Sequence, residues 1–170
     1  MQGHTEGRLV SLDVSFGAAP PQALVTPLCQ SLLEMCRPTL DEDAASRLRL
    51  TAHELLENIA KYSAEDGCEL RFTLRRAGAA LFATVETRNV PRGEHRHDVD
   101  ERLAALCAAR DPHEHYDAVI ASSARQPAGS GLGLARIHAE TEYRISHHFE
   151  GEALVIVASG EIWSKSGEQS

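Results

Sequence analysis

The chain has 170 residues, 42% hydrophobic and 25% charged, which excludes a disordered tail, a fibrous repeat and a disulfide-rich miniprotein. A chain of this length buries about 70% of the surface that its unfolded form exposes, enough for a true core. Its 17 basic and 25 acidic residues give a net charge of −8, which argues against a duplex-binding module and against docking on an anionic membrane. The expected partners are therefore proteins or small ligands.

Targeting signals and cysteine pairs are absent from the sequence pattern. The first residues lack the basic and apolar regions of a secretory signal, and no apolar run reaches the roughly 18 residues of a membrane span. Cys29, Cys36, Cys68 and Cys107 show no CxxC spacing, so we expect free thiols and a cytoplasmic protein.

Hydrophobic periodicity predicts the elements of the first half of the chain. They are a strand over 10–16, a helix over 23–36, a helix from a cap at Thr39 or Asp41 to about Ser63, and a hairpin of strands 70–74 and 81–89. The second half predicts two short helices over 100–109 and 113–123, a helix over about 134–142, and a final hairpin of strands 143–149 and 153–159. We expect one domain, residues 1–163, followed by a polar tail, residues 164–170.

The long helix that ends near Ser63 carries two stripes. Its apolar seam is expected to pack on the sheet and comprises Ala45, Leu48, Ala52, Leu55, Ile59 and Tyr62. Glu54, Asn58 and Lys61 share the flank beside that seam. This flank is either the solvated side of an amphipathic helix or a metal and phosphate site, because an Asn oxygen suits Mg²⁺ and a nearby Glu can deprotonate a nucleophile. The spacing alone does not decide between the two.

A glycine-rich segment precedes the last predicted helix. It consists of Gly129, Ser130, Gly131, Leu132 and Gly133. Glycine lets the backbone approach a ligand closely, and the N–H groups at a helix start can bind an anion. The alternative is a flexible loop that only leads into a helix.

Together the two segments resemble a known superfamily. The run from His53 to Ser63 closely resembles the N box of the GHKL ATPases, and the run from Gly129 to Leu134 resembles their G2 box. The order of the motifs and the hairpin between them also match, so the resemblance covers about residues 40–160. It implies the Bergerat fold, an α/β two-layer sandwich in which a mixed, mostly antiparallel sheet carries helices on one face and ATP lies between the layers.

The resemblance also implies a role for each matching residue. Glu54 would be the general base, Asn58 the Mg²⁺ ligand, and Lys61 a residue near the phosphates. The glycine-rich segment would bind the phosphates of ATP through Gly129, Ser130, Gly131, Leu132 and Gly133, and the backbone of Gly131 and Gly133 would close over them.

The sequence departs from the family at the G1 box, Asp-x-Gly-x-Gly, which normally follows the hairpin. The segment from Val85 to Gly93 has no Asp there and one glycine. Asn89 stands in its place and could accept a hydrogen bond from the adenine amino group, although a neutral acceptor is weaker than a charged one.

A stand-alone domain of this size is similar to the bacterial anti-sigma-factor serine kinases and to the SiaB-like regulators of partner-switching systems, and the altered G1 box is closer to the latter. This resemblance implies an ATP- and Mg²⁺-dependent serine/threonine kinase that acts on a STAS-domain antagonist, controls a sigma factor or another response protein, and forms a homodimer. The alternative is a pseudokinase, a protein-binding scaffold without catalysis.

The remaining candidates have weaker signals. The pairs His95 and His97, and His113 and His115, suggest a metal site but have no cysteine beside them, and closed zinc sites need four well-placed ligands. The adjacent pair His147 and His148 is expected to flank a strand end. Arg136, after the glycine-rich segment, could hold phosphate, but exposed arginines are common and we expect it to be one of them.

Overall fold

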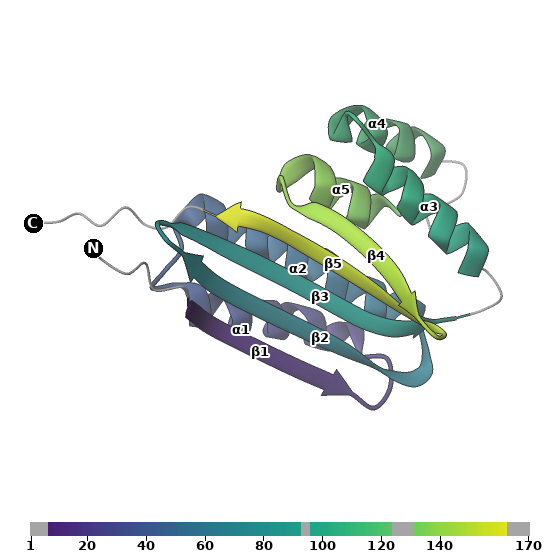
Figure 1. The fold of residues 1–170 in the computed structure, drawn as a ribbon. Helices are drawn as coiled ribbons and strands as arrows, with labels where there is room; N and C mark the ends of the chain where they lie inside the picture. The colour runs from purple at the N-terminus through teal and green to yellow at the C-terminus, as the bar shows by residue number, and fades with distance from the viewer. Residues whose placement is uncertain (1–6, 93–95, 124–130, 163–170) are drawn as a thin grey trace, which may run out of the picture.

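Strands from both ends of the chain form one sheet. The computed structural model describes residues 7–92, 96–123 and 131–162, which form the following elements: β1 (Gly7–Phe16), η1 (Gln22–Leu24), α1 (Val25–Cys36), α2 (Glu42–Tyr62), β2 (Ser63–Ala77), β3 (Ala80–Pro91), α3 (Arg96–Ala108), α4 (Pro112–Ser123), α5 (Leu132–Glu140), β4 (Arg144–Glu150) and β5 (Ala153–Ile162). The strand order is β1-β2-β3-β5-β4 (Figure 1).

The architecture is a two-layer α+β sandwich, as predicted. Helices α1 and α2 cover one face of the sheet, and α5 packs beside α2 (Figure 1). Each pairing between the described strands is antiparallel, so no parallel pair of the expected mixed sheet occurs among them. Among the described elements, no helix covers the opposite face of the sheet, which we call the open face (Figure 1).

Alternation along β3 shows why the sheet has one buried face. Leu81, Ala83 and Val85 point to the helices and are fully buried, while the residues between them face the open side. The same inward direction continues through Thr87 and Asn89, which are also buried. The central strand therefore carries polar side chains into the helix layer only at its last third.

Helix α2 begins where its capping residue predicts. The Asp41 carboxylate accepts a hydrogen bond from the backbone N–H of Ala44 at 2.8 Å, which satisfies one of the free N–H groups of the first turn. The predicted seam is buried from Leu48 to Ile59, but Tyr62 is 44% exposed and Ala45 is only half-buried. A straight helix drifts about 20° per heptad, so the ends of a heptad seam rotate away from the sheet.

Helix α5 starts earlier than the periodicity predicts. Gly131 has a φ of 68°, in the left-handed region, and forms the N-cap, so Leu132 and Gly133 already belong to the helix. The helix ends at Glu140, and Glu142 follows with a positive φ of 59°. The predicted turn at 129–133 is therefore partly helical.

Helices α3 and α4 form the insertion between the central hairpin and α5. Helix α3 runs beside the edge strand β4, and α4 packs on α5 (Figure 1). Within the described residues, no helix is long and apolar enough to cross a membrane. The predicted tail, residues 164–170, lies outside the described part of the chain.

Candidate functional site

The first turn of α5 lies directly against Glu54 of α2. A Cβ atom on Gly133 would overlap Oε2 of Glu54, so only glycine permits this approach without a shift. On the same helix, Nη1 of Arg136 lies 3.4 Å from Oε1 of Glu54. The Glu54 side chain is 16% exposed as a result. At this residue the helix flank is covered by α5 and is not solvated surface.

Asn58 follows Glu54 by one helical turn and carries an unsatisfied polar atom. Its Nδ2 is shielded from solvent and has no hydrogen-bond partner in the described part of the structure. A shielded polar group without a partner typically costs about 1–3 kcal/mol. Such a group fits a ligand-binding role, and a half-turn of the amide would present Oδ1, a hard neutral oxygen of the kind that Mg²⁺ accepts, at the same place.

Lys61 is paired within its own helix. Its ammonium forms an ion pair with the Glu57 carboxylate, which also accepts from Nε2 of Gln22 at 2.9 Å. The hydrogen bond from Lys61 lowers the pKa of Glu57, and the same bond raises the pKa of Lys61. Lys61 would have to leave Glu57 before it could reach a phosphate.

A backbone hydrogen bond joins the residue after β3 to the last residue of α2. The backbone N–H of Arg92 donates to the carbonyl oxygen of Tyr62 at 2.8 Å, and Nε of Arg92 donates to the carbonyl of Ser63. Asn89 lies just before this junction on the inward face and is 6% exposed. The structure therefore places Asn89 at the same end of the helix layer as Asn58.

The glycine-rich segment is described in part. Gly129 and Ser130 lie outside the described residues. Gly131 caps α5 with its carbonyl, which accepts from the N–H of Ala135 at 3.1 Å, and Leu132 and Gly133 form the first turn. The predicted base and the predicted phosphate-binding helix are thus brought into contact at Gly133.

The contact of Arg136 with Glu54 was not predicted from the sequence. Its guanidinium bridges Glu54 on α2 and Glu140 on its own helix, where Nε lies 3.1 Å from Oε1 of Glu140. In the sequence, only the position of Arg136 within one helical turn of Gly133 indicated this contact, and the helix was expected to start later, at about Leu134.

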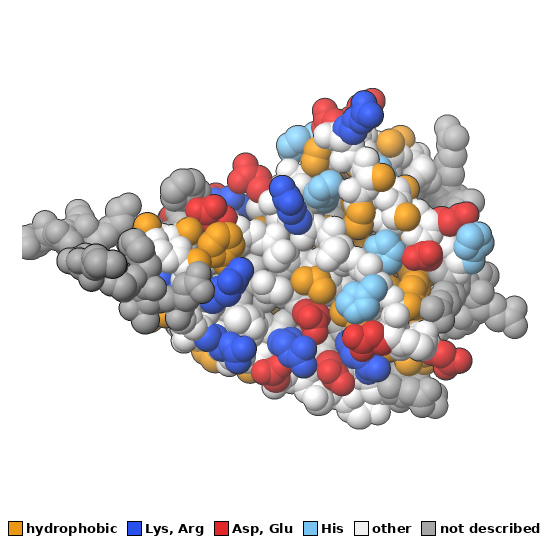
Figure 2. All heavy atoms as spheres, in the orientation of Figure 1, with side chains coloured by type: hydrophobic (Ala, Val, Ile, Leu, Met, Phe, Trp, Pro, Cys, Tyr) orange, Lys and Arg blue, Asp and Glu red, His pale blue; other side chains and the backbone are white. Residues whose placement is uncertain are grey.

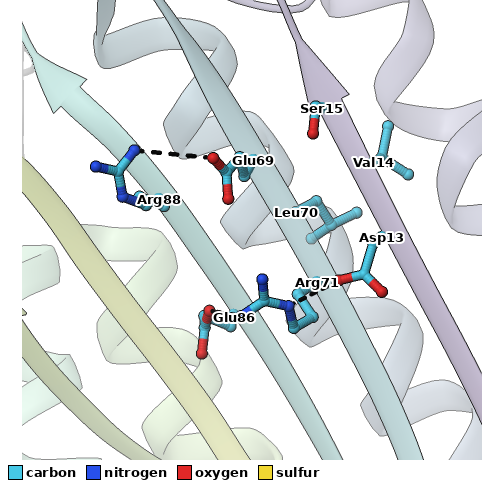
Figure 3. A pocket seen from close by; sticks show the side chains of 8 residues that line it. All are labelled: Asp13, Val14, Ser15, Glu69, Leu70, Arg71, Glu86 and Arg88. Carbon is cyan, nitrogen blue, oxygen red and sulfur yellow. Dashed lines mark hydrogen bonds and ion pairs between the residues drawn. The ribbon is translucent and has the colours of Figure 1, made fainter.

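A shallow depression on the open face of the sheet lies on the other side from this site (Figure 3). Its charged side chains pair across the strands: Arg71 binds Asp13 at 2.7 Å and Glu86 at 2.9 Å. Figure 2 shows acidic and basic side chains interspersed along this face. Because these charges neutralise one another, the depression is a weaker candidate for a nucleotide than the α2–α5 junction.

Comparison with known proteins gives a fold likeness. No family model matches the chain, and no curated protein matches it. A chain in the crystal structure of the SiaB–SiaC complex from Pseudomonas aeruginosa is similar, with a TM-score of 0.53 and 13% sequence identity over 91% of this chain and 91% of that chain. The two chains share a fold. The likeness extends over nearly the whole of both.

Proposed function

We propose that this protein is an ATP-binding regulator of the GHKL type in a partner-switching system, and that it phosphorylates a serine or threonine of a STAS-domain antagonist. The observation that carries the proposal is the contact of Glu54 with Gly133, beside the unsatisfied amide of Asn58. The fold likeness to a chain from a two-protein complex supports a protein partner.

Each residue of the junction has a task in this proposal. Asn58 would hold Mg²⁺ through its amide oxygen, and the start of α5 would bind phosphate oxygens through its backbone N–H groups. Bound Mg-ATP would supply the transferable phosphoryl group. Glu54 would take the proton of the acceptor hydroxyl, and Arg136 would hold the Glu54 carboxylate in place.

Calorimetric titration with Mg-ATP tests nucleotide binding. We expect saturable, Mg²⁺-dependent heat that disappears in Asn58→Ala. Because Nδ2 of Asn58 has no partner in the described structure, that variant should be at least as stable as the parent chain, so the loss would not reflect unfolding. Ser31→Ala, on the exposed side of α1, is a matched polar-to-alanine control and should bind normally. Absence of heat up to millimolar ATP would refute the proposal.

A second function is favoured by one specific observation. Asn89 occupies the place of the adenine-binding Asp, which weakens the expected adenine contact. On this reading the protein is a pseudokinase that binds its partner without phosphoryl transfer. Incubation of the protein and a STAS-domain antagonist with radiolabelled ATP separates the two: transfer that is lost in Glu54→Gln supports the kinase, whereas a stable complex without transfer supports the scaffold.

A further inference from the structure

A thiol, an imidazole and a carboxylate meet between α3 and β4, away from the α2–α5 junction. Nδ1 of His147 on β4 lies 3.9 Å from Sγ of Cys107 on α3. Nε2 of the same ring lies 2.9 Å from Oδ1 of Asp100, two helical turns before Cys107. A nucleophile, a base and an orienting acid are therefore arranged in series across two elements.

The Asp100 contact sets the state of the imidazole. A carboxylate accepts hydrogen bonds, so the tautomer of the neutral ring that fits this contact has its proton on Nε2 and its Nδ1 lone pair toward Cys107. The thiol at present donates to the carbonyl oxygen of Ile145 at 3.2 Å. Rotation about the Cβ–Sγ bond turns the S–H from that carbonyl toward Nδ1, and such contacts are commonly long before a reactant binds.

Cys107 differs from the other cysteines in its exposure. Cys29, Cys36 and Cys68 are buried, whereas Cys107 is exposed. Burial raises the pKa of Cys29 and of Cys36 to about 11, and partial desolvation also raises the pKa of Cys107. The Cys107 thiol is thus accessible but protonated at neutral pH, so its reaction needs a base beside it.

We infer that Cys107 is a modification site for small disulfides, activated by His147 and oriented by Asp100. Nδ1 of His147 takes the thiol proton, and the thiolate attacks one sulfur of the disulfide. A new S–S bond forms to Cys107 while the disulfide's own S–S bond breaks. Cys107 is oxidised, the departing thiolate is the reduced product, and it takes the proton from His147.

The modification has a structural consequence. A mixed disulfide replaces the proton that Cys107 donates to the Ile145 carbonyl, so α3 loses a contact with the edge of β4. We expect faster hydrogen exchange in α3 after modification, while α2 keeps its protection.

The test uses the aromatic disulfide dithiobis-nitrobenzoate on the folded chain. One thiol should react rapidly, and Cys107→Ser should remove that phase. His147→Gln should slow it by about tenfold or more at neutral pH, since a positioned base contributes on the order of 10²–10⁴-fold. His148→Gln is the matched control, because that side chain is 56% exposed and contacts Glu150.

A variant and a matched control test the role of the Asp100 carboxylate. Asp100→Asn should slow the reaction, whereas Glu101→Gln, whose carboxylate contacts His97 at 3.2 Å, should not. The pH dependence of the reaction rate in the parent chain is a second test, which does not require any variant to fold. The rate of an unassisted thiol falls about tenfold per pH unit below its pKa, whereas the rate of a thiol assisted by a base becomes independent of pH. Equal reaction rates for His147→Gln and His148→Gln would overturn the inference. A rate that falls about tenfold per pH unit in the parent chain would also overturn it.

Discussion

The same substitution, glycine to alanine, should have opposite consequences at two positions. A Cβ atom on Gly160 of β5 would lie 2.7 Å from Cδ1 and 3.3 Å from Cγ of Tyr143. That ring is 1% exposed and cannot move aside. Overpacking a core costs about 1–3 kcal/mol, offset by about 0.5–1 kcal/mol because alanine restricts the unfolded chain.

We therefore expect Gly160→Ala to lower the free energy of unfolding by about 1 kcal/mol, and by no more than about 2.5 kcal/mol. For a chain of this size, each kcal/mol corresponds to about 2–4 °C in Tm, so the melting temperature should fall by about 2–4 °C. Urea denaturation followed by circular dichroism measures the change directly.

Gly133→Ala is the matched control. Its Cβ would meet the end of the Glu54 side chain, which is flexible and can rotate away. Alanine favours a helix over glycine by about 1 kcal/mol. The ion pair that would be disturbed has one solvent-accessible partner, Arg136 at 44% exposure, and is worth about 1 kcal/mol or less. Stability should stay level or rise, while Mg-ATP binding or phosphoryl transfer should suffer. Equal destabilisation by the two substitutions would refute the reasoning.

Three further results are expected. Asp41→Ala removes the cap of α2 and should cost about 1 kcal/mol in urea denaturation, and Asp41→Asn should restore most of it; equal loss in both variants would contradict the capping role. The pKa of Glu57 in the folded chain is below its ordinary value of 4.5, so its contribution to stability is present above that pH and is lost as the pH falls through the folded value. Glu57→Gln should therefore make the free energy of unfolding depend less on pH in acid. An unchanged dependence on pH would contradict the stabilising pair with Lys61. The Tyr143 hydroxyl is shielded and has no partner in the described residues, so Tyr143→Phe should not lower Tm, whereas a drop above about 4 °C would reveal a lost hydrogen bond.

Local patterns predicted the elements well where one face of each is buried. Strand β1 is an example, because Val10, Leu12 and Val14 alternate with polar residues and pack against the core as predicted. The wrong predictions concern the ends of elements. Strand β2 follows α2 without a loop. Helix α5 starts at Leu132, earlier than predicted, because the left-handed Gly131 is its N-cap.

The contacts within the sites were less predictable. The motifs identified Glu54 and Gly133 as site residues. Only the fold shows that the Glu54 carboxylate contacts the backbone of Gly133. Cys107 and His147 are separated in the sequence by helices α4 and α5 and by the first part of β4, so no periodicity joins them. Their proximity depends on how α3 is laid along β4, which is a tertiary feature.

The strand order has a consequence for how the molecule folds. Strand β5, the last in the described chain, pairs with β3 on one side and with β4 on the other, so it completes the middle of the sheet. Strands β2 and β3 can form a hairpin early, and β1 adds to β2 across the connection through α1 and α2, but β3 then has an unpaired edge until β5 inserts. Such long-range pairing is slow and leaves a strand edge open to other chains. A ribosome-bound chain that ends before Ala153 should therefore aggregate or recruit chaperones, and the addition of the final strand should release it.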